Sequence, residues 1–212
     1  MKRIIFIIII LTISFAINSQ IRRGISPFRF VPDMYLGANI GPNAFFGEGI
    51  GQYLLNGSVG ISESFFLGYN FTQLFGARVM GSFGSMSWPL QPVTSTDKHF
   101  STMSMSVEGL LNVTNIFSYY NLNKPLDVVF FGGLGFISRD KALYQNEFMG
   151  LLLKGGAQLD YRINYKFDIN LNLTGNIVAD DFNELTTGLP FDAFPEVKIG
   201  LTYHIRGGNG FR

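Results

Sequence analysis

Cysteine is absent from the 212 residues of this chain, and charged residues are scarce. Without cysteine the chain forms no disulfide, holds no thiolate-bound metal and carries no lipid on a cysteine side chain. Asp, Glu, Lys and Arg make up 15% of the residues, against roughly 25% in an average soluble domain. The net charge of +1 gives no electrostatic reason to expect nucleic acid or another polyanion as a partner.

A long hydrophobic run is missing from the chain after its first twenty residues. The longest candidates there, such as VVFFGGLGFI at 128–137, have the length of a tilted transmembrane strand and are too short for a transmembrane helix. At the start, two basic residues precede an apolar run from Ile4 to Ile17, and the small residue Ser19 follows. This pattern indicates a secretory signal peptide at 1–19, with an N-terminal membrane anchor as the alternative.

The chain does show strict alternation of apolar and polar residues. In FDINLNLTGNIV at 167–178, Phe, Ile and Leu occupy odd positions, whereas Asp, Asn and Thr occupy even ones. Period two is the repeat of a β-strand with one apolar and one polar face. Glu63 is an exception, because parity places it on the apolar face, and a β-bulge would explain it. In all, eight alternating segments predict eight strands, near 34–42, 58–69, 74–85, 102–114, 126–137, 148–163, 167–178 and 194–205.

The predicted connections are short at one rim and long at the other. NFTQ at 70–73 and NYK at 164–166 are short, whereas the segments after the first, third, fifth and seventh strands are longer. This asymmetry is typical of outer-membrane barrels, whose short turns face the periplasm. NIFSYYNLNKP at 115–125 departs from it as a long connection on the short side. The organisation we predict is a signal peptide at 1–19, a short periplasmic segment at 20–32, a barrel at 33–205 and a tail at 206–212.

The apolar faces of the strands point either into a protein core or outward to lipid. A soluble eight-stranded barrel would show the same alternation around an apolar lumen. Its outer face would then carry many Lys and Glu, but here the polar face holds mainly Ser, Thr, Asn and Gly. The charges on this polar face have both signs, and symmetric hairpins would place Arg78 opposite Glu108 and Arg162 opposite Asp168. We therefore expect lipid outside and a neutralised polar lumen inside.

Aromatic residues near the predicted strand ends agree with this orientation, because Tyr and Trp favour the interface between membrane and water. One rim is expected to carry Tyr69, Phe75, Tyr161, Tyr165, Phe167 and Tyr203, and the other Phe83, Trp88, Phe136, Phe148 and Phe194.

Several stretches resemble the OmpA/OmpX-like family of eight-stranded outer-membrane barrels. They are YLGANIG in the first strand, LGYNFTQLFGARVMGSFG across the first short turn and IGLTYHI in the last strand. The resemblance is one of pattern and architecture, and it covers nearly the whole chain after the signal peptide. It implies an all-β, transmembrane, eight-stranded antiparallel up-and-down β-barrel that the barrel-assembly machinery inserts into the outer membrane.

The charged residues of the polar face are the first candidate site. Because the interior of an eight-stranded barrel is just wide enough for side chains to fill, we interpret them as a structural network. A narrow gated conduit or a proton path is the alternative. The predicted lumen network comprises Arg78, Glu108, Asp127, Lys154, Asp160, Arg162, Asp168, Glu196 and Lys198.

Two loop segments carry weaker signals for chemistry. TSTDKHFS at 94–101 brings Ser95, Asp97 and His99 together, but neighbours on one loop rarely form the convergent geometry of a catalytic triad. The carboxylates at 180–184 match calcium ligation only loosely. We therefore predict no catalytic residues, no metal and no cofactor.

The sequence as a whole predicts a non-enzymatic integral barrel of the bacterial outer membrane, with periplasmic termini and a structural or accessory role. Its expected partners are outer-membrane lipid, lipopolysaccharide and other outer-membrane proteins. A subunit of a larger secretion, uptake or assembly complex is one alternative, and a lipid-modifying enzyme is a less favoured one. Exposed apolar residues usually mark a contact surface. The loop residues expected at such a contact are Phe45, Phe46, Leu54, Leu55, Trp88 and Leu90.

Overall fold

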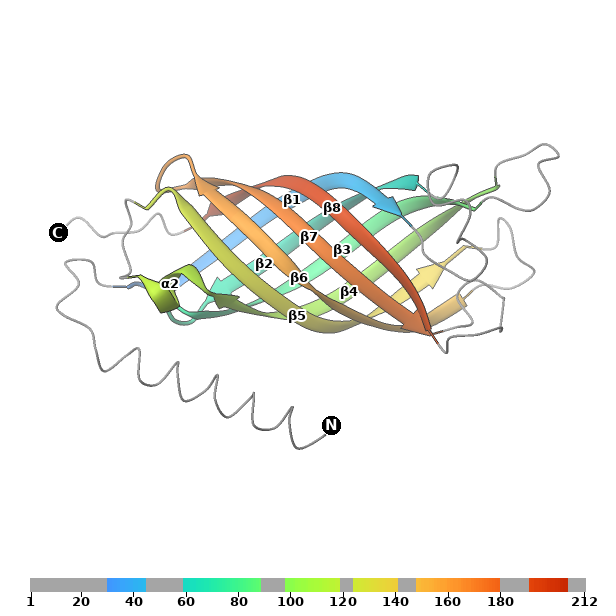
Figure 1. The fold of residues 1–212 in the computed structure, drawn as a ribbon, viewed down its shortest axis with the longest axis horizontal. Coiled ribbons are helices and arrows are strands. Elements are labelled where there is room, and N and C mark those ends of the chain that lie inside the picture. The colour runs from blue at the N-terminus through green and yellow to red at the C-terminus, as the bar shows by residue number, and fades with distance from the viewer. Residues whose placement is uncertain are drawn as a thin grey trace, which may run out of the picture.

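Eight antiparallel strands close into a barrel in the computed structural model (Figure 1), which describes residues 30–44, 59–88, 98–118, 124–140, 148–179 and 191–205. Each strand pairs with its neighbours in sequence, and the first strand closes the barrel against the last. The predicted fold class is therefore confirmed. The strands are β1 (Asp33–Ala44), β2 (Val59–Asn70), β3 (Phe75–Trp88), β4 (Lys98–Asn112), β5 (Leu126–Arg139), β6 (Phe148–Arg162), β7 (Phe167–Ala179) and β8 (Phe191–His204).

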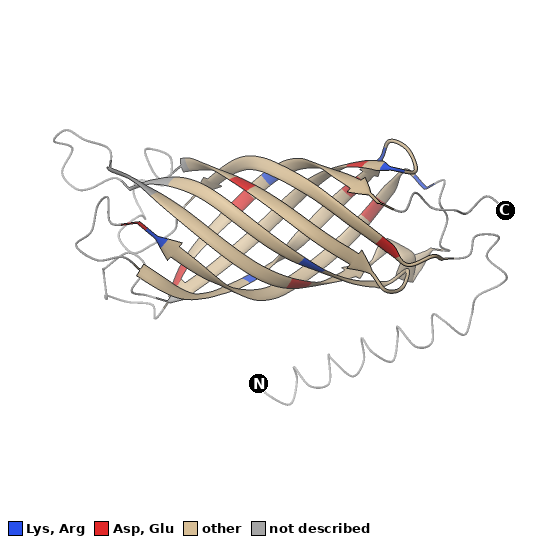
Figure 2. Cartoon of the chain, turned by 180° about the vertical axis from the view of Figure 1, so that it is seen from behind, with Lys and Arg blue, Asp and Glu red and all other residues tan. Residues whose placement is uncertain are grey.

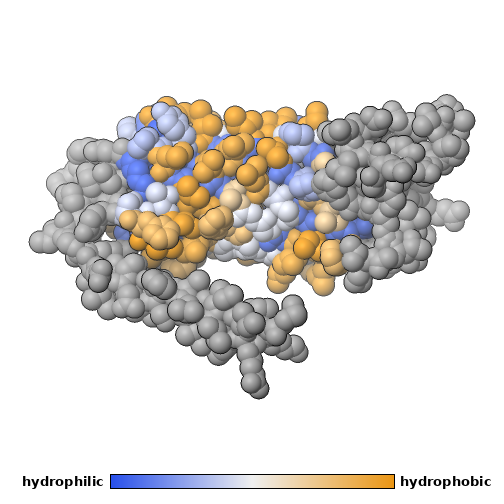
Figure 3. Space-filling model, in the orientation of Figure 1, coloured by the Kyte–Doolittle hydropathy of each residue, from blue (hydrophilic) through white to orange (hydrophobic). Residues whose placement is uncertain are grey.

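The apolar faces of the strands point outward. In β7, Leu171 and Leu173 expose 38% and 47% of their surface, whereas the alternating residues Asn170 and Asn172 expose 0% and 2%. Figure 3 shows the resulting surface, on which hydrophobic residues cover much of the barrel wall. A soluble barrel would have the opposite arrangement, since its apolar side chains would fill the lumen. Charges of both signs are distributed along the strands (Figure 2), and nearly all of those that the structure describes face inward.

Several strands extend further than their apolar pattern indicates. β3 continues to Trp88, which pairs with Lys98 at the start of β4, so Trp88 is a strand residue and its prediction as a loop residue was wrong. β5 ends at Arg139 and β8 begins before Asp192, although both residues were expected in loops. Both are buried on the inner face. Backbone pairing thus extends these strands through inward-facing charged residues that the apolar pattern did not include.

The short turns are built by polar side chains that accept backbone hydrogen bonds. Thr72 Oγ1 accepts from the N–H groups of Leu74 and Phe75 in the β2–β3 turn. Asn164 Oδ1 accepts from the N–H groups of Lys166 and Phe167 in the β6–β7 turn. Such local bonds fix the hairpin register, because they replace the ladder bonds that a turn leaves unmade.

One helical turn, α2 (Thr114–Phe117), lies in the connection between β4 and β5. Asn115 is buried and donates from Nδ2 to the backbone oxygen of Gln73, which ties α2 to the β2–β3 turn. Within the described ranges, no helix is long and apolar enough to cross a membrane.

Glycine is required where the barrel interior is most crowded. A Cβ at Gly68 would overlap the ring of Tyr35, and a Cβ at Gly200 would overlap the side-chain amide of Asn39. Both glycines lie on the inner face, so the large inward side chains of β1 occupy the space that a side chain on β2 or β8 would need. The lumen is therefore packed from both sides.

The aromatic rims agree with the sequence in part. Tyr69 and Phe75 are exposed near the β2–β3 turn, and Phe83 is exposed toward the opposite end. Phe148 and Phe194 were expected at the second rim as well, but they alternate with outward residues and face the interior, where Phe194 is 4% exposed. Their placement at the membrane interface was wrong, because both share parity with the buried charges of their strands.

Candidate functional site: the barrel lumen and the outer surface

The centre of the lumen holds one carboxylate between two cations. Arg78 and Glu108 are directly opposed in the β3–β4 register, and Arg78 Nε lies 2.6 Å from Glu108 Oε2. The other oxygen of Glu108 lies 3.2 Å from Lys154 Nζ and accepts a 3.0 Å hydrogen bond from Ser106. All three charged side chains are nearly inaccessible to solvent. Two cations on one buried carboxylate form a cluster in which each charge depends on the others.

Arg78 also contacts the walls of the lumen. Its Nη1 donates to Gln158 Oε1 at 2.5 Å, and Gln158 in turn donates to Asp160 at 2.6 Å. The guanidinium carbon lies 5.4 Å from the centroid of Phe66 and 4.6 Å from that of Phe131, in cation–π geometry. The group is therefore held by neighbours on β2, β4, β5 and β6, so it spans the lumen.

A second ion pair lies on β8 and is tied to β2 by a hydrogen bond. Lys198 Nζ lies 3.1 Å from Glu196 Oε2, and the Oγ of Ser62 donates to the other carboxylate oxygen at 2.9 Å. Glu196 and Lys198 are two residues apart on the inner face of one strand, so their pairing follows from the alternation of the strand.

The third group of charges lies at the end of the barrel that carries the short turns. Arg162 lies within 3.7 Å of Asp127 and 3.6 Å of Asp168. His204 contacts two carboxylates, because its Nε2 lies 2.9 Å from Asp168 Oδ2 and its Nδ1 makes a short contact with Asp33. Since Asp33 lies on β1 and Asp168 on β7, His204 joins the three strands that meet where the barrel closes.

All nine residues of the predicted lumen network lie on the inner face of the barrel. Six of them are buried, namely Arg78, Glu108, Lys154, Asp168, Glu196 and Lys198. Asp127, Asp160 and Arg162 are half-buried. The predicted lumen network did not include the uncharged partners Ser62, Ser106 and Gln158, or the carboxylate of Asp33. Parity within each strand would have identified them, because they alternate with the outward apolar residues.

At the middle of the lumen, the inner-face side chains that the structure describes are closely packed. Asn39, Ser64 and Ser82 form one cross-strand row on the inner faces of β1, β2 and β3. Ser64 exposes 0% and Asn39 4% of its surface, and polar atoms of all three residues lack hydrogen-bond partners. A passage as wide as a water molecule would expose these atoms. The side chains therefore fill the cross-section, as expected for eight strands.

Glu63 is the exception on the outer surface. The β1–β2 and β2–β3 registers run through Glu63 without interruption, opposite Ile40 and Phe83, so the expected β-bulge is absent. The side chain is exposed between Ile61 and Phe65, which are also exposed. Of the charged side chains that the structure describes within the eight strands, Glu63 alone faces outward.

Most of the predicted loop sites lie outside the described residues. These are Phe45, Phe46, Leu54, Leu55, Leu90, Ser95, Asp97 and the carboxylates at 180–184. His99 is a strand residue of β4, paired with Ser87. Among the residues that the structure describes, no group of three or more His, Cys, Asp and Glu side chains is arranged to hold a metal ion.

Similarity to known proteins supports the fold. No protein-family model and no curated protein sequence matches the chain. The structure is similar to Neisserial surface protein A, with a TM-score of 0.53, 14% identity and coverage of 85% of this chain and 99% of that one. It is also similar to a major outer membrane protein from Thermus thermophilus, with a TM-score of 0.51, 11% identity and coverage of 83% and 100%. OprG from Pseudomonas aeruginosa gives a TM-score of 0.50, 12% identity and coverage of 84% and 98%.

The chain thus has the fold of the small outer-membrane barrels. At these identities the similarity extends to architecture alone, which is the level at which the sequence resembles the OmpA/OmpX-like family.

Proposed function

We propose that the protein is an integral barrel of the bacterial outer membrane, with periplasmic termini, a closed polar lumen and a non-enzymatic structural or accessory role. The observation that carries the proposal is the separation of its two faces. Outward residues such as Leu134, Leu151 and Met149 expose more than two thirds of their surface, whereas Arg78, Glu108 and Lys154 are sealed inside. Exposure of the outward apolar side chains to water is unfavourable, whereas contact with lipid is favourable.

The lumen supports a structural role over transport. Ion pairs join β3 to β4, β4 to β6 and β5 to β6, a further pair lies within β8, and the side chains that make them also occupy the cross-section. Such a network stabilises a closed barrel and leaves no path for a solute. The partners expected for such a protein are the surrounding lipid and lipopolysaccharide.

Fractionation of cells that express a C-terminally tagged chain tests this proposal. We expect the protein in the outer-membrane fraction after density-gradient separation, resistant to carbonate extraction and faster in gel migration before boiling than after. The tag should be digested by protease only after the outer membrane is permeabilised. Recovery in the soluble fraction would contradict the proposal, and digestion in intact cells would contradict the periplasmic termini.

An accessory role in a larger complex is the second candidate. Phe117 on α2 exposes 86% of its surface, the largest value among the exposed apolar side chains that the structure describes, and Asn115 fixes α2 against the neighbouring turn. This fixed, exposed aromatic at the short-turn end supports a contact with another protein. Co-purification in mild detergent would show a stoichiometric partner that Phe117→Ser loses; a barrel that purifies alone would contradict this candidate.

The lipid-modifying enzyme is tested separately. Replacing Ser95, Asp97 and His99 together should leave lipid composition and cell phenotype unchanged. A change in outer-membrane lipids in the triple variant, at unchanged protein level, would favour the enzyme instead.

A further inference from the structure

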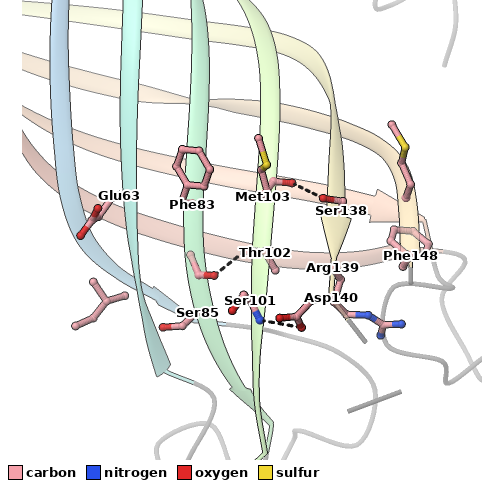
Figure 4. A pocket seen from close by; sticks show the side chains of 13 residues that line it. Glu63, Phe83, Ser85, Ser101, Thr102, Met103, Ser138, Arg139, Asp140 and Phe148 are labelled. Atoms are coloured by element: carbon pink, nitrogen blue, oxygen red, sulfur yellow. Dashed lines mark hydrogen bonds between the residues drawn. The ribbon is translucent and has the colours of Figure 1, made fainter. Parts of the chain in front are cut away.

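The two ends of the barrel differ in how their carboxylates are arranged. At the long-loop end, a hollow of about 930 Å³ is lined by Glu63 and Asp140, but Phe83 and Met103 lie between them (Figure 4). These two carboxylates are therefore too far apart to bind one group together. At the short-turn end the carboxylates instead face one shared space, the lumen, and Figure 2 shows acidic residues gathered at this end.

The short-turn end of the lumen has more carboxylates than cations. Asp127 and Asp160 are directly opposed in the β5–β6 register, and like charges in this position are destabilising. The described cations that pair with carboxylates at this end are Lys124 and Arg162, together with His204 when it is protonated. Even then one carboxylate is left over. The four inward carboxylates here are those of Asp33, Asp127, Asp160 and Asp168.

Asp160 is the carboxylate without a cation. It accepts a 2.6 Å hydrogen bond from the side-chain amide of Gln158, and no described Lys, Arg or His lies within ion-pair distance of it. Lys166 is also at this end, but its Nζ lies 5.6 Å from the centroid of the exposed ring of Tyr165. Asp160 therefore faces Asp127 across the sheet with no counter-charge of its own.

A side chain from outside can reach this end of the lumen. Side-chain exposure rises from 1% or less at Arg78 and Glu108 to 23% at Arg162 and 15% at Asp127. Asp168 is 5% exposed, yet its Oδ1 accepts no hydrogen bond within the described part of the chain. Buried carboxylate oxygens are normally hydrogen-bonded, so this end of the lumen lacks a donor.

The chain enters the barrel at this same place. β1 begins with Asp33, whose side chain contacts His204, and the segment QIRRGISPFR at 20–29 precedes the described residues. The segment has no acidic residue, so its charge is complementary to that of the short-turn end. Its basic residues are Arg22, Arg23 and Arg29.

The segment is long enough to reach Asp160 on β6. Arg22 lies eight residues before Phe30. Eight extended residues span up to about 27 Å, whereas strand spacing and tilt give an eight-stranded barrel a width of roughly 16 Å. The tail at 206–212 also follows a strand that ends here, but its two arginines are at its opposite ends. Arg22 and Arg23 are adjacent, as two opposed carboxylates require.

From this arrangement we propose that the segment at 20–29 folds back into the short-turn end of the lumen, where Arg22 and Arg23 bind Asp160 and Asp127. The guanidinium group is suited to this position, because its planar fork binds a carboxylate through two parallel hydrogen bonds. The inference rests on the predicted removal of residues 1–19 and on the barrel geometry. It does not depend on the proposed membrane insertion.

Trypsin digestion of the refolded mature chain in detergent micelles, read by mass spectrometry, tests the inference. Trypsin must bind the arginine side chain itself, so a docked arginine resists cleavage. We expect cleavage after Arg22 and Arg23 to be about tenfold faster in Asp160→Asn than in the wild type, as loss of one charge-assisted contact gives. Asp127→Asn should act in the same direction, and it provides the test if Asp160→Asn does not fold.

Asp192→Asn is the matched control, because it removes a buried inner-face carboxylate near the opposite end of the barrel. Cleavage in this variant should stay as slow as in the wild type. Equal cleavage of the wild type and Asp160→Asn would overturn the inference. Protection after Arg206 in place of Arg22 and Arg23 would also overturn it, since the tail would then be the occupant. The gel shift on boiling reports folding independently, so a failure of the barrel and a failure of the segment to dock give different results.

Discussion

Arg78 and Glu108 face each other across β3 and β4 with 2.6 Å between Nε and Oε2, and neither side chain exposes more than 1% of its surface. The same carboxylate also holds Lys154. One acidic group therefore pairs with two cations at the centre of the barrel, and the side chains of this cluster occupy the lumen there.

Glu108→Gln should destabilise the barrel by about 3–5 kcal/mol, the usual cost of breaking a buried ion pair. The change leaves Arg78 and Lys154 close together with no counter-charge. Arg78→Met should cost less, since the pair of Lys154 with Glu108 survives. Urea unfolding in liposomes, followed by the gel shift on boiling, measures both variants; an equal loss in the two would show that Glu108 does not hold two cations.

Two adjacent glycines of β6 should respond differently to replacement by alanine. A Cβ at Gly156 points inward into the backbone oxygen of Leu173, whereas a Cβ at Gly155 points outward and meets its nearest atom at 3.7 Å. Gly156→Ala should cost about 1–3 kcal/mol or prevent folding, as overpacking does. Gly155→Ala should stay within about 0.5 kcal/mol, as surface changes do. Similar losses in the two variants, measured by the same urea unfolding, would contradict the assigned inner and outer faces.

His204→Leu should weaken the closure between the first and last strands. It removes the group that contacts both Asp33 and Asp168, and each buried polar group left without its partner costs about 1–3 kcal/mol. In His204→Gln the new side chain keeps a polar group but reaches fewer partners than histidine does. The stability of this variant should therefore lie between that of the wild type and that of His204→Leu. Hydrogen exchange of the β1 and β8 amides should increase in the same order, while exchange in β4 and β5 stays unchanged. Uniform exchange along all strands would argue against a local role at the seam.

An outward arginine should be costly at the middle of the barrel and tolerated at its rim. Leu134→Arg places a charge on a side chain that is 68% exposed near the centre of β5, and in a bilayer this costs about 2–4 kcal/mol. Leu126→Arg, at the short-turn end of the same strand, should cost about 0–1 kcal/mol. Folding yields into lipid vesicles compare the two variants. A soluble barrel would accept either charge on its outer face, so equal yields would contradict lipid contact.

The alternation of side chains was readable from the sequence because a strand places successive residues on opposite faces whatever its surroundings. The same rule correctly assigned Glu63 to the outer face, where no bulge was needed. Strand ends were less readable, because backbone pairing of β5 and β8 includes Arg139 and Asp192, whose charges favour a loop in the sequence. Hydrogen bonds of the ladder do not depend on apolar side chains there.

The lumen contacts were predictable only in part. Arg78 and Glu108 could be paired from the symmetry of one hairpin, since both lie on adjacent strands. The contact from Arg78 to Gln158 crosses between strands that are not neighbours in the sheet, and no local pattern encodes it. His204 and Asp33 meet only because the barrel closes, so their contact depends on the number of strands and their stagger.

Single-channel recording from the mature chain in planar bilayers tests the closed lumen most directly. Insertion is verified first by the gel shift on boiling, and Arg78→Ala combined with Phe131→Ala serves as the variant in which the centre of the lumen is emptied. We predict no stepwise conductance from the wild-type barrel and measurable steps or leak from the double variant. Reproducible conductance steps from the inserted wild-type chain would contradict a lumen filled by its ion-paired side chains.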